Sequence, residues 1–472
     1  MTGILWTASE AANATNGHCN KDWNATGVSI DSRTSKRGDL FIALKGPKFD
    51  GHDYAAKALE KGAVAAVVDH KPTDLNCRDS VLEVKNTFDA LRLFGKASRA
   101  RTNAKVIGVT GSVGKTGTKE ALRHALCDQG KVISNIHSYN NHWGVPLSLA
   151  QMSKDSDYGI FEIGMNHPGE ITPLAEMVRP DVAIITTIEP AHIEFFNTIE
   201  EIADAKAEIF SGMTTGTAII NRDNPHYKRL AQLAKNSRVK NILSFGEHPK
   251  SDVRLVSFTS DCSGNNIEAI VCGRRLGYRL GLPGKHLVQN SLAVLATTFA
   301  LNTDVAKAAQ RLSELKPLPG RGNQTIIHLN NGPIKIIDET YNANPASMSA
   351  AIHTLGTMKS SSCGRRIAAL GEMLELGDQT YKFHREIGPA LIKNKIDLVF
   401  ACGLEMSEMF QDLPDKMRGG FSETSNGLIG QISKKVRPGD IITVKGSAAN
   451  KMNVIVDALS NLEKATKNVG EG

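Results

Sequence analysis

The stretch 105–120, KVIGVTGSVGKTGTKE, decides the fold class of this chain. A β-branched run at 106–109 predicts a buried strand, two glycines punctuate the loop that follows, and Lys115 and Thr116 open a helix. A glycine-rich loop between a strand and a helix directs backbone N–H groups and the positive end of the helix at an anion. The stretch therefore predicts a phosphate-binding loop, in which Lys115 would bridge terminal phosphates and the Thr116 hydroxyl would bind Mg²⁺.

The spacing of this loop departs from the general motif GxxxxGK[ST]. That motif requires a glycine where Val109 stands, so the shorter form Gly-x-x-Gly-Lys-Thr is present at 111–116. A glycine-rich turn with an exposed lysine is the competing interpretation. The position of the loop between a predicted strand and a predicted helix favours nucleotide binding.

Length, composition and charge exclude several classes of protein. With 472 residues, 41% of them hydrophobic and 22% charged, the chain is expected to form about three globular domains. The net charge of +7 is spread without a basic run, so we expect no nucleic-acid partner. Seven cysteines without a CxxC pair indicate reduced thiols in a cytoplasmic protein. The N-terminus lacks the pattern of a signal peptide, and the apolar runs are too short for membrane insertion.

Strand and helix patterns divide the chain into three parts. Residues 1–84 predict a short α/β unit, and 85–317 predict a parallel sheet covered by helices on both faces. Turn-rich segments at 253–279 indicate an antiparallel patch within the second part, and the Pro/Gly-rich stretch 316–322 is a candidate hinge. The remainder, 318–472, alternates again. Strands are predicted at 40–44, 63–68, 106–109, 159–163, 182–188, 334–337, 367–370, 398–401 and 441–444, and helices at 54–61, 199–213 and 290–301.

Two side chains suited to a metal follow predicted strands near the phosphate-binding loop. Glu162 lies at the end of the strand 159–163, and His192 follows the strand 182–188. Ligands of parallel sheets bind beyond the carboxyl ends of the strands. A carboxylate suits Mg²⁺ or Mn²⁺, and an imidazole does so less often. A surface or capping carboxylate and a hydrogen-bonded loop histidine are the competing interpretations, and the neighbouring phosphate loop favours the functional ones.

Lys206 lies where an apolar residue is expected. The segment 198–201 has a capping-box pattern and begins the helix predicted over 199–213. Lys206 follows Ile202 by four residues and precedes Ile209 by three, so it shares their apolar face. An inward lysine needs a partner or a modification, unless its ammonium extends to solvent. Burial would lower its pKa and make the neutral amine reactive towards CO₂, and a carbamate would supply an anionic oxygen that could orient Mg²⁺.

Two further candidates flank the hinge. Arg321 lies among mobile glycines and could reach a terminal phosphate from the neighbouring domain, or it could be a solvated loop arginine. Asp338 follows a predicted strand, where it could accept hydrogen bonds from a ribose or cap the following turn.

Together these residues resemble the Mur ligases, the ATP-dependent amide-forming enzymes of peptidoglycan synthesis, over essentially the whole chain. The resemblance implies three α/β domains: a small N-terminal domain (1–84) for a UDP-sugar peptide, a central P-loop parallel-sheet ATPase domain (85–317), and a Rossmann-like C-terminal ligase domain (318–472). It implies the cofactors ATP and Mg²⁺. The implied ATP-binding residues are Thr110, Gly111, Ser112, Val113, Gly114, Lys115, Thr116, Asn290, Arg321 and Asp338. The implied metal ligands are Thr116, Glu162, His192 and carbamoylated Lys206, and the implied catalytic residues are Lys115, Lys206, His192 and Arg321.

Several stretches are most similar to the family members that add D-alanyl-D-alanine to UDP-N-acetylmuramoyl tripeptide. They are DSR with GDLFIALKGPKFDGHDY, YNN with GVP, EIGMNHPGEI, DETYNANPASM, GEMLELG and VKGS. The similarity implies an acyl-phosphate route to the amide and a monomeric cytoplasmic enzyme. The implied substrate-binding residues are Ser32, Arg33, Asn140, Asn141, Tyr341, Asn342 and Asn344.

The chain also departs from the family pattern, and other classes of protein remain. Thr187, Glu189 and Pro190 interrupt the usual TNIGxAH stretch, Gly117 replaces a frequent threonine, and the usual KGSRS continues as Ala448-Ala449 after Ser447. A GTPase-like switch would carry an NKxD motif, which the sequence lacks. A module that binds nucleotide only structurally is the other alternative.

Overall fold

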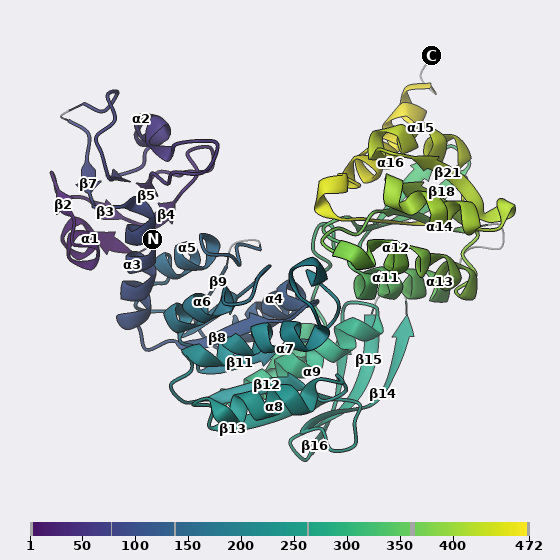
Figure 1. Ribbon diagram of the computed structural model, residues 1–472, viewed down its shortest axis with the longest axis horizontal. Helices are drawn as coiled ribbons and strands as arrows, with labels where there is room; N and C mark the ends of the chain where they lie inside the picture. The colour runs from purple at the N-terminus through teal and green to yellow at the C-terminus, as the bar shows by residue number, and fades with distance from the viewer. Residues whose placement is uncertain (1–2, 77, 136–137, 262–263, 359–363, 470–472) are drawn as a thin grey trace.

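The computed structural model describes residues 3–76, 78–135, 138–261, 264–358 and 364–469. It has three α/β parts, with the N-terminal part and the C-terminal part on opposite sides of the central one (Figure 1). The three-domain α/β fold predicted from the sequence is therefore confirmed. Among the described helices, none combines the length and apolar character needed to cross a membrane.

The N-terminal part is built on a five-stranded sheet in the order β2-β7-β6-β5-β4. Its strands β4 to β7 are paired in parallel, and β2 joins the edge antiparallel to β7. A two-stranded ribbon, β1 with β3, lies beside it. The bounds are β1 Trp6–Thr7, α1 Ala8–Thr15, β2 His18–Cys19, β3 Asn24–Ala25, β4 Gly27–Ser29, β5 Asp39–Ile42, α2 Ala55–Glu60, β6 Ala65–Val68 and β7 Val81–Glu83.

The core of the N-terminal part continues into the central part. Helix α3 (Thr87–Ala100) packs against both α1 and α5 (Gly144–Ala150). Trp6 is buried, its ring meets that of Phe94 edge-on at 4.8 Å, and its indole N–H donates a hydrogen bond to the carbonyl of Ala150 at 2.9 Å. These contacts anchor the first strand of the chain to the domain that carries the phosphate-binding loop.

The central part holds a nine-stranded sheet in the order β16-β15-β14-β13-β12-β11-β8-β10-β9. The strands from β8 to β14 pair in parallel, and β14, β15 and β16 form the antiparallel patch predicted at 253–279. This patch extends the main sheet instead of forming a separate one. The bounds are β8 Lys105–Thr110, β9 Val132–Ser134, β10 Tyr158–Glu162, β11 Val182–Ile185, β12 Thr217–Asn221, β13 Asn241–Gly246, β14 Val253–Asp261, β15 Gly264–Val271 and β16 Arg274–Leu280.

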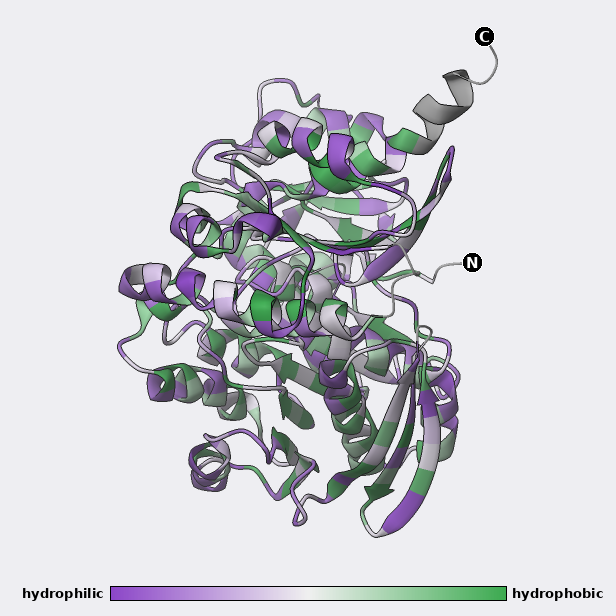
Figure 2. Ribbon diagram, turned by 90° about the vertical axis from the view of Figure 1, so that its right-hand side faces the viewer, coloured by the Kyte–Doolittle hydropathy of each residue, from purple (hydrophilic) through white to green (hydrophobic). Residues whose placement is uncertain are grey.

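Apolar clusters cover both faces of the central sheet. In Figure 2 the interior strands carry mostly hydrophobic residues, whereas the long edge hairpin carries many hydrophilic ones. One face is covered by α4 (Lys115–Leu126), α9 (Lys285–Ala300) and α10 (Val305–Leu312). The other is covered by α5, α6 (Ile171–Val178), α7 (Ile199–Ala207) and α8 (Tyr227–Asn236).

Two predicted elements of the central part end at least three residues earlier than expected. The strand predicted over 182–188 ends at Ile185, because the next residues leave the sheet to hold the phosphate-binding loop: Thr186 donates to the Val113 carbonyl and Thr187 accepts from the Ser112 N–H. The helix predicted over 199–213 ends at Ala207 and continues as a 3₁₀ turn, Glu208–Gly212.

The C-terminal part holds a six-stranded sheet in the order β17-β18-β22-β19-β20-β21, parallel except for the β17–β18 hairpin. Helices cover both of its faces (Figure 1). The strands are β17 Asn323–Leu329, β18 Gly332–Glu339, β19 Arg366–Gly371, β20 Leu398–Cys402, β21 Arg418–Ser422 and β22 Ile441–Lys445. The helices are α11 Pro345–Thr357, α12 Thr380–Arg385, α13 Ile387–Lys393, α14 Ser407–Asp412, α15 Ser425–Lys435 and α16 Asn453–Val469.

A buried carboxylate fixes the start of β22. Asp440 has 0% exposure and accepts hydrogen bonds from the Arg365 guanidinium, at 2.7 Å and 3.1 Å, and from the backbone N–H groups of Arg365 and Arg437. Removal of one member of a buried ion pair leaves the other charge without compensation and costs about 3–5 kcal/mol. We therefore expect Asp440→Ala to lower the free energy of unfolding of the C-terminal part by this amount, measured by urea denaturation.

The control is Asp412→Ala in the same part of the chain. Asp412 pairs with Arg385 across 3.3 Å with both side chains more than half exposed, so its loss should cost less than about 1 kcal/mol. Equal losses for the two variants would contradict the role given to Asp440.

Candidate active site

A cavity of about 600 Å³ lies between the central and C-terminal parts. Its walls come from the phosphate-binding loop, the carboxyl ends of central strands, the hinge, and the loop after β18. Most residues predicted to bind nucleotide, metal or substrate line it. They are Ser112, Val113, Gly114, Lys115, Thr116, Asn140, Glu162, His192, Asn290, Arg321, Tyr341, Asn342 and Asn344.

The phosphate-binding loop is held in shape by its two glycines. Gly111 has φ +143°, and a Cβ atom there would lie 2.0 Å from the Thr186 hydroxyl. Gly114 has φ +87°, and a Cβ there would press on the Asn290 amide at 2.9 Å. Thr110 is buried at the end of β8, directly before the loop. Only glycine fits these two positions. Every other residue carries a Cβ atom, which would clash here, and rarely adopts such φ values.

The Lys115 ammonium folds back over this loop. It donates a hydrogen bond to the Gly111 carbonyl at 2.6 Å. Burial lowers the pKa of Lys115, the Glu162 carboxylate opposes this shift, and the Arg321 guanidinium adds to it. The lysine therefore lies among the charges that would surround a bound polyphosphate.

Glu162 is held at the end of β10 with both of its carboxylate oxygens occupied. The Thr116 hydroxyl donates to Oε2 at 2.9 Å, and the Asn140 amide donates to Oε1 at 2.7 Å. Its side chain is 1% exposed. Oxygen donors of this kind are the ligands that Mg²⁺ prefers. Thr116 and Glu162, both predicted as metal ligands, thus lie in contact, and Asn140, predicted to bind substrate, contacts the same carboxylate.

Two residues that the sequence analysis missed support Glu162. The Asn135 amide accepts from the Glu162 N–H at 2.6 Å and donates to the Glu162 carbonyl at 3.3 Å. The Lys119 ammonium is fully buried and donates to the Asn135 carbonyl at 3.0 Å. The signal for Lys119 was its place on α4, one turn after Lys115, among buried positions.

His192 lies at the cavity wall in the left-handed backbone region, with φ +60°. Its Nδ1 atom is 2.5 Å from Oε2 of Glu375, a residue of the C-terminal part. The hydrogen bond from His192 holds the pKa of the Glu375 carboxyl below its ordinary value. Glu375 lies in the GEMLELG stretch, and its contact with His192 was not predicted from the sequence.

Lys206 is fully buried, which excludes the interpretation of an ammonium that reaches solvent. Within the part of the chain that the structure describes, its Nζ atom has no hydrogen-bond partner. Burial lowers the pKa of Lys206 well below its ordinary value, and the nearby Lys115 ammonium lowers it further. An orphaned, readily deprotonated amine of this kind fits a residue that is modified to an anionic metal ligand.

Arg321 extends from the hinge across the domain gap. Its guanidinium lies 3.8 Å above the Tyr341 ring and donates to the Ser138 hydroxyl at 3.4 Å. Asp338 organises the hinge: its carboxylate accepts from the N–H of Gly320 at 3.0 Å and from the N–H and hydroxyl of Thr340. The structure thus places Asp338 in a turn-capping contact, and the ribose contact stays a prediction.

Several residues predicted to bind substrate have clear structural contacts. Asn344 caps α11, and Asn141 accepts from the N–H groups of Trp143 and Gly144 at the start of α5. The Asn342 carbonyl accepts from the Lys445 ammonium at 2.9 Å. Lys445, a cavity residue without a role in the sequence analysis, lies 3.6 Å from Glu339, and burial lowers its pKa.

Ser32 and Arg33 lie in the N-terminal part, away from this cavity. Arg33 pairs with Asp31 at 2.8 Å and has an 85% exposed side chain. The Lys61 ammonium donates to the Ser32 carbonyl at 2.9 Å. The two sets of predicted residues therefore form two regions on different domains.

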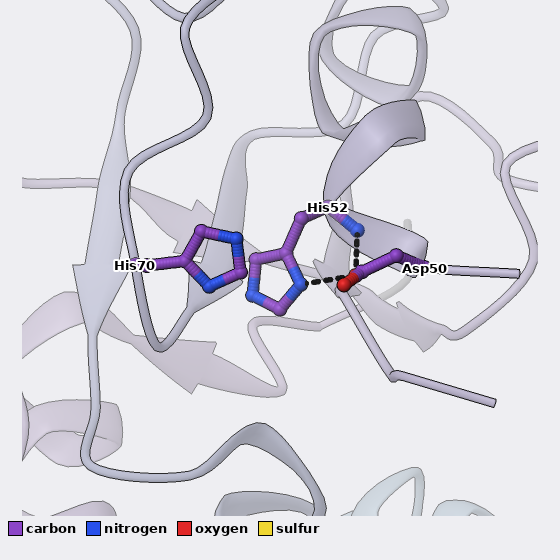
Figure 3. A group of neighbouring side chains, drawn as sticks. All are labelled: Asp50, His52 and His70. Atoms are coloured by element: carbon purple, nitrogen blue, oxygen red, sulfur yellow. Dashed lines mark hydrogen bonds and ion pairs between the residues drawn. The ribbon is translucent and has the colours of Figure 1, made fainter. Parts of the chain in front are cut away.

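A second group of potential metal ligands, Asp50, His52 and His70, lies in the N-terminal part (Figure 3). His52 is buried, and both of its ring nitrogens have partners: Asp50 at 2.6 Å and the N–H of Asp69 at 3.2 Å. The His52 and His70 rings stack with centroids 4.0 Å apart. Because the lone pairs of stacked rings run side by side instead of converging, this geometry favours a structural histidine over a metal site.

The phosphate-binding loop, the carboxylate beside it and the second α/β domain across the cavity define a P-loop enzyme that uses a nucleotide. Three family models match the chain: "Mur ligase family, catalytic domain" at 24–99, "Mur ligase middle domain" at 109–298, and "Mur ligase, glutamate ligase domain" at 324–448. The chain belongs to the Mur ligase family.

Several similar proteins are named for the same reaction. The UDP-N-acetylmuramoyl-tripeptide–D-alanyl-D-alanine ligase of Rickettsia prowazekii is 34% identical over 455 residues, which are 96% of this chain and 99% of that protein. The crystal structure of MurF from Acinetobacter baumannii is 30% identical, with a TM-score of 0.83 over 97% of this chain and 99% of that one. MurF from Thermotoga maritima in complex with ADP is 28% identical, with a TM-score of 0.77 over 93% and 98%.

The glycine contacts predict the effect of a single methyl group. Gly111→Ala would push a Cβ into the Thr186 hydroxyl and distort the loop, and a displacement of about 1 Å at such a site can lower a reaction rate about 100-fold. We expect the rate of ATP-dependent turnover to fall by that order and ADP binding, measured by calorimetry, to weaken. Gly117→Ala is the control, because its Cβ would meet nothing within 4 Å and alanine favours the helix. Unchanged binding in Gly111→Ala would contradict the loop assignment.

Proposed function

We propose that this chain is an ATP-dependent ligase that joins D-alanyl-D-alanine to UDP-N-acetylmuramoyl tripeptide through an acyl phosphate. The observation that carries the proposal is the cavity in which a phosphate-binding loop, Glu162 and the hinge arginine meet at the boundary of two domains. Relatives that carry the name of this reaction, matched over nearly their full length, support the choice of substrates.

The proposal assigns the cavity to ATP. The N–H groups of the loop 110–116 and the start of α4 would bind the phosphates, with Lys115 and Arg321 adding positive charge. Asn290 would contact the base, and Asp338 would contact the ribose. Phosphoryl transfer depends mainly on such positioning and charge, so these side chains would supply most of the catalysis.

The residues present fit Mg²⁺ as the second cofactor. Thr116, Glu162, His192 and a carbamoylated Lys206 would hold it, since hydroxyl and carboxylate oxygens already meet within 2.9 Å and the buried amine lacks a partner among the described residues. When bound, Mg²⁺ neutralises the charge that develops on the transferred phosphoryl group.

The proposed reaction has two steps. The terminal carboxylate of the tripeptide attacks the γ-phosphorus of ATP, which forms an acyl phosphate and releases ADP. The amine of D-alanyl-D-alanine then attacks the acyl carbon, the amide forms, and phosphate leaves. Water would hydrolyse the acyl phosphate, so the C-terminal domain has to close the cavity during the reaction.

The three domains would divide the substrates between them. Residues 1–84, with Ser32 and Arg33, would bind the UDP end of the acceptor, and 85–317 would bind ATP. Residues 318–472 would contribute Tyr341, Asn342 and Asn344 for the dipeptide. Asn140 and Asn141 would lie between the two regions. A monomeric state stays a prediction from the family.

The loop lysine provides the first test. Lys115→Ala should reduce release of ADP, in the presence of UDP-N-acetylmuramoyl tripeptide and D-alanyl-D-alanine, below detection, because the charge that bridges the phosphates is lost. Lys105→Ala, at a 61% exposed lysine, is the control and should retain activity. Wild-type phosphate release with D-alanyl-D-alanine, compared with D-glutamate, L-lysine and diaminopimelate, tests the substrate. No turnover with any of them would favour a module that binds nucleotide only structurally.

Lys206 provides the second test. A neutral buried amine adds CO₂ and loses a proton to form a carbamate, so ¹³C-bicarbonate should give a carbamate NMR signal that disappears in Lys206→Ala. This variant should be nearly inactive and partly rescued by short-chain carboxylates that replace the missing anion. The same carboxylates should not rescue Lys115→Ala. Normal activity of Lys206→Ala would refute the carbamate.

A further inference from the structure

We propose that Glu375 is a positioning residue that sets the orientation of His192 when the C-terminal domain closes on the central domain. This inference rests on the proposed function, because it gives His192 a place at the metal. Glu375 itself belongs to the loop after β19, and its carboxylate crosses the domain boundary to His192.

The contact joins two short loops whose backbones are both unusual. His192 has φ +60° and Glu375 has φ +62°. Residues other than glycine rarely adopt this left-handed region, histidine more often than glutamate, and such residues cluster at functional sites. Both loops thus have a left-handed backbone where the two side chains meet, with Nδ1 and Oε2 2.5 Å apart.

Neighbouring contacts hold the two loops against each other. The Glu194 N–H donates to the Glu375 carbonyl at 3.3 Å. A Cβ at Gly377 would lie 3.1 Å from the Glu194 Cα, so the two backbones approach closely there. Ile193 packs against the apolar core of the C-terminal domain. The turn Ile193–Phe195 of the central domain is therefore seated on the C-terminal domain beside the cavity.

The hydrogen bond determines which ring nitrogen carries the proton. An ionised carboxylate only accepts hydrogen bonds, so Nδ1 of His192 donates to Glu375, and in the neutral ring the lone pair is then on Nε2. Histidines that bind metals are oriented in this way by a carboxylate or carbonyl on the opposite nitrogen. Here the orienting carboxylate comes from another domain, so only the closed arrangement supplies it.

The test combines a spectroscopic readout with kinetics. The enzyme is labelled with ¹⁵N at its histidines and studied without metal or nucleotide. The ring ¹⁵N chemical shifts of His192 then report its tautomer, and its signals are assigned as those lost in His192→Gln. Glu375→Ala should shift these resonances away from the Nδ1–H form, whereas Glu375→Gln, which still offers an acceptor oxygen, should preserve them. In the ligase assay Glu375→Ala should raise the Mg²⁺ concentration for half-maximal rate by about 10- to 100-fold.

The matched control is Glu194→Gln, which removes the carboxylate of an exposed neighbouring residue and leaves its backbone N–H free to donate to the Glu375 carbonyl. It should leave both the ring resonances and the Mg²⁺ dependence unchanged. Ring resonances that are unaffected by Glu375→Ala, or an equal Mg²⁺ shift in Glu194→Gln, would overturn the proposal. The ¹⁵N measurement needs no substrate, so its result is independent of the turnover assays with different substrates. If none of those substrates were turned over, the proposed function would be refuted and the tautomer result would still hold.

Discussion

The parallel pairing of β8 between β10 and β11 is the constraint on which the candidate site depends. Val109 pairs with Glu162, and Thr110 pairs with Ile185, so three strands end at one edge of the sheet. The phosphate-binding loop, the Glu162 carboxylate and Thr186 are brought together by this register alone. A slip of one residue would turn Glu162 to the opposite face of the sheet. The apolar clusters on both faces make such a slip costly, because it would exchange the side chains of the two faces and disrupt the packing of both.

The buried charges of the site do not balance as they stand. Burial lowers the pKa of both Lys115 and Lys206, and the Lys115 ammonium lowers the pKa of Lys206 further. Such an arrangement opposes folding unless a ligand or a modification compensates it. A polyphosphate would supply negative charge beside Lys115, and a carbamate would change Lys206 from a cation to an anion. The excess positive charge of the free protein thus has the sign that ATP and a carbamate would compensate, and the negative charge that they bring would in turn attract Mg²⁺.

The features that could be predicted from the sequence are those that depend on residue spacing within one segment. The central strands, the loop that follows β8 and the inward direction of Lys206 all follow from spacing within one segment. The partners that sequence missed are distant along the chain: Glu375 lies 183 residues from His192, and Lys445 lies 103 residues from Asn342. Asp338 shows a further limit, because a carboxylate after a strand can cap a turn or bind a ligand, and only the three-dimensional structure reveals the turn.

The site is complete only when two domains meet, and the chemistry explains why this is useful. An acyl phosphate survives only where water is excluded, yet its two substrates and ATP must enter from solvent. In the proposed function, the C-terminal domain closes the cavity after the substrates have entered. Arg321 on Ser138 and Glu375 on His192 are contacts between the central and C-terminal parts. Each brings a charged group of the C-terminal part to the cavity or its wall. The movement proposed to exclude water would therefore also assemble the charges for phosphoryl transfer, so that activation of the carboxylate and protection of its product would be coupled.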